Sequence, residues 1–512
     1  MPHSSATGNL LSVWTESSME RIGLQDAVGS RQSVQIYAAR GEYEPFQIGI
    51  RASSNTVSGI NVSVSDFVDP NTNSRLDRSN VTLYREHFVP VNHGSQVTIK
   101  SVNRPKGTGW YADALIPFVD PQTGKDIQNA RLDATPFMLY EGDTAVIWVD
   151  VYVPPGTRSG TYEATYTVTS DAGSYSNLIQ LRVWDFDLPK TSFLKSEFSI
   201  YSNQGQVGAI ELLKHRLNPF MVAQPLSFGE QQNLVSQWGL QSQRLPLWSG
   251  ADYHTGQMAP PPSVSTIQEL VNDYDGRLFK YARFADEIDR FPELTESIKA
   301  WSRNIHAAGV NTAMTVTPNP ALYDDGSGTG RSAVDIWILT PDMYENAGSR
   351  IAEVQQQGHE IWLYKALVQD EYSPKWQLDF DPINYRISQG FISQSLGITG
   401  LLYWSVDDWT KQPWRSVEML YPQAGRYYVG EGMLVYPGNY VGVQGIVPSM
   451  RLKWIREGVE DYDYIELLKR AGYKDLALQY SRLVGENWRN WTRDPEVLES
   501  TRRQIGETLE RL

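Results

Sequence analysis

The feature that most constrains the fold of this chain is a change in hydrophobic period near Pro189. Before it, from about residue 10 to residue 188, apolar and polar residues alternate in short runs separated by turns rich in Gly, Pro, Asn and Asp. A period of two is that of a half-buried β-strand, and many short strands in succession are typical of an antiparallel β-sandwich. Residues 1–188 are therefore predicted to form a β-sandwich domain, with a long loop at residues 107–117 that reaches a neighbouring domain.

After Pro189, short apolar runs alternate with longer runs of helical length, such as residues 294–308, 342–357 and 381–396. Strand followed by helix, repeated several times, is the pattern of a parallel (β/α)8 barrel. Residues 189–428 are therefore predicted to form a TIM-like barrel. Its eight strands are expected at residues 194–201, 220–223, 244–247, 279–285, 311–316, 334–338, 360–367 and 398–405.

Residues 429–512 are predicted to form a C-terminal extension of one strand and several helices that packs on the barrel. Its strongest helix begins near Pro448, and its charged residues are expected to form a solvated face. The apolar face of this helix is marked by Leu452, Ile455, Val459, Tyr462 and Ile465, which recur at helical spacing. The chain as a whole is thus predicted to be a multidomain protein of the β plus α/β class.

Charge and hydropathy exclude several kinds of partner. The formal net charge is −14 and the pI is about 5.1, so the chain has no basic excess with which to neutralise the phosphates of a nucleic acid or an anionic membrane. No run of about 18 apolar residues is present, so no membrane-spanning segment is predicted. The sequence leaves the oligomeric state open, a homo-oligomer included.

The chain has no cysteine, which excludes disulfides, zinc–thiolate sites and cysteine nucleophiles. Its seven histidines show no metal-ligand spacing, and neither a metal nor a cofactor is expected. The first residues lack the basic and apolar regions of a signal peptide. The localisation therefore stays open between the cytoplasm and, if a leader has been removed, secretion or the periplasm.

Adjacent carboxylates, Asp286 and Glu287, follow the fourth predicted barrel strand. An Asp-Glu pair is most often a solvated loop, but in a parallel barrel the chemistry sits at the carboxyl ends of the strands. Other carboxylates and aromatic residues fall in or after the later predicted strands. Those predicted to bind substrate there are Trp337, Tyr364, Tyr403, Trp404, Asp407 and Trp409, and core packing is the alternative for each aromatic.

Carboxylates among aromatic platforms suit glycoside hydrolysis. One carboxylic acid protonates the leaving oxygen while another group stabilises the positive charge that develops at the sugar, whose apolar C–H faces stack on aromatic rings. The sequence contains no Gly-rich phosphate loop with the usual spacing and no Gly-x-Ser-x-Gly elbow. A glycan or glycoconjugate is therefore the predicted substrate.

Several motifs of the chain recur together in one family of proteins. Besides the Asp286-Glu287 pair, they are GEYEPFQ at residues 41–47, YADALIP at 111–117, GLLYWS at 400–405, GMLVYPG at 432–438 and RLKWIREGVEDY at 451–462. In these motifs the chain resembles glycoside hydrolase family 123 and related bacterial proteins that share its C-terminal region, and the resemblance covers most of the chain. Tyr436, within the fourth of these motifs, is a further residue predicted to bind substrate.

The resemblance implies a retaining β-N-acetylgalactosaminidase that uses the 2-acetamido group of its substrate as the nucleophile. In this scheme Asp286 accepts the acetamido N–H and balances the charge of an oxazolinium intermediate. Glu287 protonates the leaving oxygen and then activates water. Because no protein nucleophile is needed, two carboxylates facing each other across the scissile bond are not required. The proposed role also demands a raised pKa at Glu287.

Two alternatives remain from the sequence. In the first, Glu287 is still the acid, but Asp407, Asp408 or Glu371 is the nucleophile on a sugar without an acetamido group. In the second, the protein binds carbohydrate without hydrolysing it. Whether hydrolysis requires a 2-acetamido group separates the first alternative from substrate assistance, and an absence of turnover marks the second.

Overall fold

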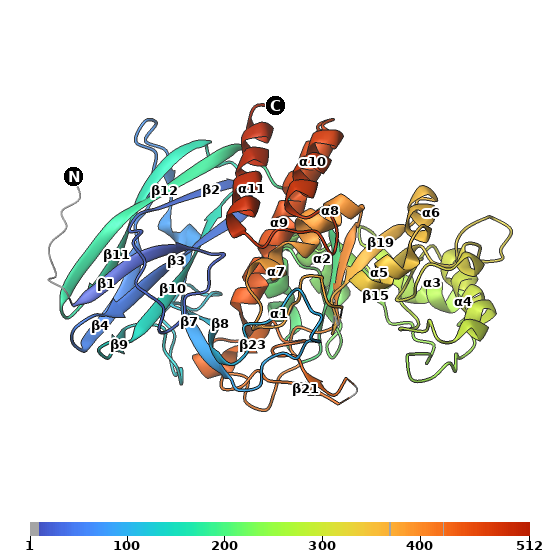
Figure 1. Cartoon of the computed structure of the whole chain (residues 1–512). Coiled ribbons are helices and arrows are strands. Elements are labelled where there is room, and N and C mark those ends of the chain that lie inside the picture. The colour runs from blue at the N-terminus through green and yellow to red at the C-terminus, as the bar shows by residue number, and fades with distance from the viewer. Residues whose placement is uncertain (1–9, 368–369, 423) are drawn as a thin grey trace.

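The computed structural model describes residues 10–367, 370–422 and 424–512. The β-sheets of the N-terminal half, blue to teal in Figure 1, lie beside a body of alternating strands and helices, green to orange. The last strand of the N-terminal sheets ends at Asp187, so the change in architecture falls where the hydrophobic period changes. The division into three domains at residues 188 and 428 stays a prediction.

The N-terminal half consists of two β-sheets that share one hydrophobic cluster. Ile48 and Val149 of the first sheet and Ile36 and Ile179 of the second belong to it. The first sheet has the order β1 (Leu11–Ser17), β3 (Glu42–Ala52), β10 (Thr144–Val153), β7 (Val81–Val91) and β8 (Gly109–Pro117). The second has the order β2 (Val34–Arg40), β12 (Gly173–Asp187), β11 (Gly160–Ser170), β4 (Val57–Val64) and β9 (Phe137–Leu139), with the short β5 (Phe67–Val68) and β6 (Arg75–Leu76) beside β11.

The prediction of an antiparallel sandwich holds in part. Strand pairing is antiparallel except between β2 and β12, which run parallel. Residues 107–117, predicted to be a long loop, mostly form β8, which pairs with β7. Within β8, the Asp113 carboxylate accepts hydrogen bonds from Arg451 and Tyr436 of the C-terminal part, at 2.8 and 2.5 Å. The segment does reach the rest of the molecule, but as a paired strand rather than as a loop.

The second half contains a parallel sheet of eight strands that curls into a nearly closed barrel. All eight predicted strands are present, in the predicted order along the chain. Backbone pairing is missing between β14 and β15, where side chains bridge the gap: Asn218 donates to the carbonyl of Ser242 at 2.7 Å, and Gln243 to that of Pro219 at 2.9 Å. The strands are β13 (Lys195–Ile200), β14 (Pro219–Met221), β15 (Ser242–Leu245), β16 (Phe279–Ala282), β17 (Asn311–Met314), β18 (Ile336–Leu339), β19 (Glu360–Tyr364) and β20 (Gly400–Tyr403).

The helices around the barrel follow the prediction less closely than the strands do. Between β17 and β18, where no helix is predicted, the chain forms a 3-10 turn, Pro320–Leu322, in a stretch rich in Gly, Ser and Asp. The helix predicted at residues 342–357 is divided at Gly348, which has a φ of 56°. The helices are α1 (Gly205–Lys214), α2 (Phe228–Trp238), α3 (Val264–Val271), α4 (Thr295–Ala307), α5 (Pro341–Ala347), α6 (Arg350–Gln356), α7 (Ile383–Arg386) and α8 (Ser393–Leu396).

The C-terminal segment lies between the two halves. Two hairpins, β21 (Leu420–Tyr421) with β22 (Arg426–Tyr427) and β23 (Val435–Pro437) with β24 (Ile446–Pro448), lead into the helices α9 (Met450–Arg470), α10 (Lys474–Val484) and α11 (Pro495–Glu510). These helices, red in Figure 1, stand against both bodies. Helix α9 begins at Ser449, whose hydroxyl accepts the N–H of Leu452 and so caps the first turn.

The expectation that the charges of the C-terminal helix form a solvated face is wrong. Nearly every residue of α9 before Glu466 is buried, and its charged side chains form ion pairs across the two halves. The pairs are Arg451–Asp113, Lys453–Asp150, Arg456–Asp150, Arg386–Glu457, Arg386–Asp461 and Arg216–Asp463, with N–O distances of 2.6 to 3.2 Å. Buried charges require such partners, because an unpaired one loses its hydration without compensation.

Candidate active site

Asp286 and Glu287 follow strand β16 at the carboxyl end of the barrel. The turn that carries them is fixed by its backbone: the carbonyl of Phe284 accepts the N–H and the hydroxyl of Ser249, at 2.9 and 2.6 Å. Asp286 also forms a single parallel β-bridge with Thr315, just beyond β17. Glu287 has a φ of 52°, in the left-handed region that non-glycine residues seldom adopt. Such strain is concentrated at functional sites.

A charge network inside the barrel positions Asp286. The guanidinium of Arg283 lies 3.4 Å from the Asp286 carboxylate and 3.8 Å from that of Glu197. Glu197 is held in turn by Arg244 at 2.9 Å and by the hydroxyl of Tyr281, which donates to it at 2.5 Å. Burial opposes the charge on Arg283, but Asp286 and Glu197 raise its pKa above the ordinary value. Arg283 is therefore a permanent cation beside Asp286.

Glu287 has the electrostatic properties of a general acid. Burial, and then the negative charge of Asp286, raise the pKa of its carboxyl from 4.5 to about 7, although Arg283 lowers it. A carboxyl with this pKa can hold a proton near neutral pH and can also release it. The two adjacent carboxyls thus differ in surroundings, since Asp286 has the cation of Arg283 beside it, whereas burial raises the pKa of Glu287.

Tyr364 and Trp404, both predicted to bind substrate, lie near this pair. Tyr364 is buried within the barrel, and its pKa is raised well above the ordinary value by burial and then by the charge of Asp286. The indole N–H of Trp404 donates to Glu431 at 3.2 Å, and Glu431 is itself among the charges that act on Tyr364. The barrel therefore brings Asp286, Glu287, Tyr364 and Trp404 into one region.

Glu431 was not among the predicted site residues. It is fully buried, burial raises its pKa, and it accepts hydrogen bonds from Gln377 at 2.6 Å and from the backbone N–H of Leu367 at 2.9 Å. It lies on the turn before β23, 27 positions after Trp404, whose indole N–H donates a hydrogen bond to it. A carboxylate on a turn-rich segment gives no periodic signal, so only the three-dimensional contact reveals it.

Two further predicted aromatics face away from the barrel interior. Trp337 is fully buried in the layer between strands and helices, where its ring meets Tyr323 edge-on and its N–H donates to His359 at 3.4 Å. Tyr403 is also fully buried; it packs against Trp376, and its hydroxyl accepts the N–H of Gly432 at 2.8 Å. These contacts give both residues a place in the core.

The remaining predicted residues connect segments of the chain. Asp407 accepts the backbone N–H groups of Tyr201 and Ser202 at 2.9 and 2.8 Å, which ties the end of β20 to the end of β13. Trp409 donates to the carbonyl of Val435 at 2.8 Å. Tyr436 donates to Asp113 of β8, as described above. A role in substrate binding stays a prediction for all three.

A cavity of about 440 Å³ opens beside Asp286, while the adjacent Glu287 is not among the residues that line it. Asp286 and Arg283 contribute to one side of it, and Arg244 lies over the ring of Phe220 at 3.8 Å on another. Its outer wall is aromatic and apolar, with Tyr201 and Trp248 about half exposed. The other lining residues include Met221, Val222, Pro225, Leu226, Leu247 and Tyr274. The cavity is large enough for one or two sugar rings and contains surfaces on which they can stack.

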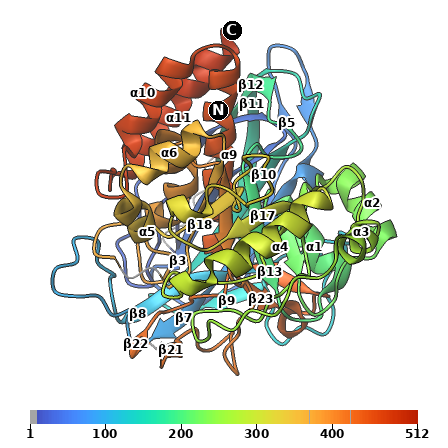
Figure 2. The same ribbon diagram turned by 90° about the vertical axis from the view of Figure 1, so that its right-hand side faces the viewer.

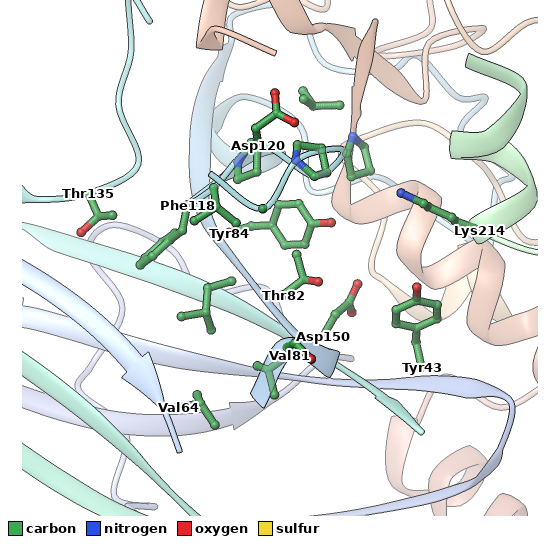
Figure 3. A pocket seen from close by; sticks show the side chains of 18 of the residues that line it. Tyr43, Val64, Val81, Thr82, Tyr84, Phe118, Asp120, Thr135, Asp150 and Lys214 are labelled. Carbon is green, nitrogen blue, oxygen red and sulfur yellow. The ribbon is translucent and has the colours of Figure 1, made fainter. Parts of the chain in front are cut away.

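A second cavity, of about 520 Å³, lies between the N-terminal sheets and helix α1 (Figure 3). Figure 3 shows Tyr43, Tyr84 and Asp150 gathered on one side of it and Lys214 of α1 on another. Burial opposes the charge of Asp150, but Arg456 and Lys453 hold its pKa well below the usual range. Its carboxylate is therefore a paired anion rather than an acid, and the candidate for catalysis remains the cavity at Asp286.

Neither a metal site nor a membrane helix is found in the part of the chain that the structure describes. Within residues 10–367, 370–422 and 424–512, no group of three or more His, Cys, Asp or Glu is arranged to hold a metal ion. Over the same ranges, every helix is too short or too polar to cross a bilayer. Metal independence of the activity stays a prediction.

Comparison with known proteins identifies the class. Residues 292–468 match the family model described as the catalytic domain of glycoside hydrolase 123. A family 123 glycoside hydrolase from Clostridium perfringens, studied for glycolipid glycan hydrolysis, has a similar fold, with a TM-score of 0.69 over 98% of this chain and 97% of that chain, at 14% identity. The protein is a glycosidase. It resembles glycoside hydrolase family 123 in the sequence of its catalytic region and in the fold of nearly the whole chain.

More distant similarities were also found. A β-glucuronidase from Parabacteroides merdae gives a TM-score of 0.31 at 10% identity, over 89% of this chain and 51% of that chain. An endo-β-1,4-mannanase from Thermotoga petrophila gives 0.30 at 11% identity, over 54% of this chain and 77% of that chain. No curated protein sequence matches. The family match begins at residue 292, after Glu287, so the roles of Asp286 and Glu287 stay a prediction.

Proposed function

We propose that the protein is a retaining exo-glycosidase that removes terminal β-linked N-acetylgalactosamine, or a related N-acetylhexosamine, with the help of the substrate's own acetamido group. The observation that carries this proposal is the contrast within the acidic pair. Asp286 lies beside the cation of Arg283, 3.4 Å away, whereas the pKa of the adjacent Glu287 is raised to about 7. One carboxylate and one carboxylic acid, side by side, match the two roles of substrate assistance.

In the first step, the acetamido oxygen attacks the anomeric carbon, and the bond from that carbon to the leaving oxygen breaks. The proton of Glu287 passes to the leaving oxygen. Asp286 accepts the acetamido N–H and balances the positive charge of the oxazolinium that forms. In the second step, the Glu287 carboxylate takes a proton from water, and the water oxygen attacks the anomeric carbon. The bond from that carbon to the acetamido oxygen breaks, so the oxazolinium ring opens and the acetamido group is restored. Two displacements at one carbon leave the configuration unchanged.

Two of the three alternative nucleophiles, Asp407 and Glu371, and the buried Glu197 are held by other groups and are therefore less suited to attack the sugar. Asp407 accepts two backbone N–H groups, and Glu371 accepts the hydroxyl of Thr98 at 2.7 Å. Glu197 is buried and held by Arg244 and Tyr281. An ionised protein carboxylate that attacked the sugar would first have to leave such partners, which favours the acetamido group as the nucleophile.

The natural substrate is proposed to be a glycan or glycoconjugate that ends in the acetamido sugar. The similar enzyme from Clostridium perfringens was studied for glycolipid glycan hydrolysis. The half-exposed Trp248 and Tyr201 at the outer cavity offer stacking surfaces for the sugar next to the one removed.

The test is a set of p-nitrophenyl β-glycosides with the same leaving group: N-acetylgalactosaminide, N-acetylglucosaminide and galactoside. We expect hydrolysis of at least one acetamido sugar and none of the galactoside, because the galactoside has a hydroxyl in place of the internal nucleophile. Hydrolysis of the galactoside at a similar rate would overturn the proposal in favour of a protein nucleophile. Proton NMR of the first-formed sugar should show the β-anomer, and an α-anomer would contradict retention.

A further inference from the structure

The loop between β7 and β8, residues 92–108, has an unusual composition for this chain. The protein carries a net charge of −14, yet residues 92–110 contain Lys100, Arg104 and Lys106 and neither Asp nor Glu. Lys106 is partly neutralised by Asp381, at 3.5 Å on the surface. Lys100 has no carboxylate partner within ion-pair distance in the described residues. Ser95, His93 and Thr98 of the loop donate to the carboxylates of Asp379, Glu418 and Glu371. Within the described residues, positive charge without a carboxylate partner is therefore confined to Lys100 and Arg104 at the tip of the loop.

The same loop exposes large apolar side chains. Ile99 is 92% exposed and Val102 is 71% exposed, one on each side of Lys100 and Ser101 in the sequence. Trp110, the second residue of strand β8, is 58% exposed. Single exposed apolar residues need no explanation, but an isoleucine with almost its whole surface in water, next to a second apolar residue and a lysine, is uncommon.

The backbone of the loop that carries these side chains is ordered by hydrogen bonds. The guanidinium of Arg104 donates to the carbonyls of Thr98, Ile99 and Ser101, at 3.2 to 3.4 Å, and so closes the tip around itself. The backbone N–H of Val102 donates to the carbonyl of Glu371 at 2.9 Å. The entropy of ordering the tip has thus already been lost, which favours binding through its exposed side chains.

The loop lies on the side of the barrel where the acidic pair is found. Glu371 follows β19, and the hairpin of β21 and β22 follows β20, so both belong to connections at the carboxyl ends of strands. His93 of the loop stacks on Tyr427 of that hairpin at 4.7 Å, and its backbone N–H donates to Glu418 at 2.7 Å. Figure 2 shows the loop projecting beside β8 and β22. Leu420 of the same hairpin is also half exposed.

We propose that the β7–β8 loop is a membrane-docking element that inserts Ile99 and Val102 into the headgroup region of a phosphatidylcholine-like bilayer. Lys100 and Arg104 would lie at the level of the lipid phosphates. Apolar tips flanked by cations are the chemistry that suits an interfacial membrane contact. The surface projects, whereas a site for a peptide or helix is a groove. The net charge of −14 disfavours a strongly anionic bilayer, but its field is screened within roughly 8–10 Å at physiological salt.

This inference rests on the proposed function, since it gives the glycan substrate a lipid anchor: the loop would hold the barrel mouth against the surface from which a glycolipid headgroup projects. Docking would raise the local concentration of headgroups at the site without a new contact to the sugar. Hydrolysis of a soluble substrate would not depend on the loop.

The first test is sedimentation with phosphatidylcholine vesicles in physiological salt. We expect the wild type to bind the vesicles. A double variant, Ile99→Ser with Val102→Ser, should bind them at least about tenfold more weakly. The matched control is Leu483→Ser, which removes an apolar side chain that is 62% exposed on α10. It should bind as the wild type does. Because all three residues are exposed, the melting temperatures should be equal.

The second test compares two substrates. On a glycolipid in the same vesicles, the double variant should lose most of its rate, while on a soluble aryl glycoside it should match the wild type. Failure of the wild type to bind vesicles, or equal binding by the double variant, would overturn the docking proposal even if the enzyme is active. Binding that depends on Ile99 and Val102, together with no hydrolysis of any acetamido sugar, would support docking and count against the proposed activity.

Discussion

The pKa of Glu287 leads to a prediction that can be followed in both activity and stability. At a pKa of about 7, about half of the molecules hold this proton at pH 7, compared with about 0.3% for a carboxyl at the ordinary 4.5. Because the protonated form is the general acid, kcat/KM on a glycoside with a poor leaving group should fall about tenfold per pH unit above about pH 8. Between pH 7 and pH 5 the protonated fraction of Glu287 only increases, so this group should cause no loss of kcat/KM over that range.

Stability should change in the same range of pH, with a sign that follows from the direction of the shift. The folded protein binds the Glu287 proton more tightly than the unfolded chain, so the free energy of unfolding falls as the pH rises from about 4.5 to about 7. At 1.36 kcal/mol per pKa unit the loss is at most about 3 kcal/mol, and access of water to the carboxyl reduces it. Glu287→Gln removes this titration but keeps the backbone strain, because glutamine is no better suited to a φ of 52°.

The assay is therefore urea unfolding of wild type and Glu287→Gln at pH 4.5 and pH 8, with kcat/KM measured across the same range. We expect the variant to gain about 1–3 kcal/mol relative to the wild type between the two pH values. Its residual activity should lack the alkaline fall. Parallel stability curves for the two proteins, or an alkaline fall that persists in the variant, would refute the reasoning that Glu287 is the titrating acid.

Three further outcomes are expected. Arg451→Met should lower the free energy of unfolding by about 3–5 kcal/mol in urea titrations, because it leaves the buried Asp113 carboxylate without the cation that pairs with it; an effect below 1 kcal/mol would contradict the importance of this pair. Tyr364→Phe should lower kcat/KM roughly 10- to 100-fold with an unchanged melting temperature, if its hydroxyl contacts the acetamido group or the charged intermediate; unaltered kinetics would remove it from the site. Exhaustive EDTA treatment should leave activity intact, and recovery by one specific divalent ion after a loss would show that a metal is required.

Much of the barrel could be predicted because its strands are fully buried. Short apolar runs such as those that became β18 and β19 are bounded by turns, and the parallel order follows from the alternation with helices. No helix is predicted between β17 and β18, where Gly326, Gly328 and Gly330 occur within five residues of chain. Glycines at this spacing disfavour a helix.

The burial of the α9 charges could not be predicted in the same way. The apolar face of the helix is visible as a periodic pattern, but Arg451 and Arg456 find their partners, Asp113 and Asp150, more than 300 positions away. A charge with a distant partner has the same local sequence pattern as a charge in water. The contact of Glu431 with Trp404 was missed for a similar reason, since a single carboxylate on a turn carries no period.

The acidic pair is predicted from its place after a strand, and the proposed division of roles depends on neighbours that the sequence does not reveal. Arg283 lies three positions before Asp286, but the strand that carries it could equally have turned its side chain away. The contribution of burial to the pKa of Glu287 is likewise a property of the folded barrel. The sequence predicts the residues, and the structure supplies the reason for assigning them different tasks.

The measurement that tests the central claim most directly is a leaving-group series with Glu287→Ala and Asp286→Asn. A dinitrophenolate leaves without a proton, so Glu287→Ala should be nearly as fast as wild type on that substrate in the first step. It should be about 10²–10⁴-fold slower on glycosides with alcohol leaving groups. Asp286→Asn should lose rate by a similar factor on both kinds of substrate, because the acetamido nucleophile needs it whatever departs. If both variants show the same dependence on leaving-group pKa, the assignment of acid and orienting carboxylate is wrong.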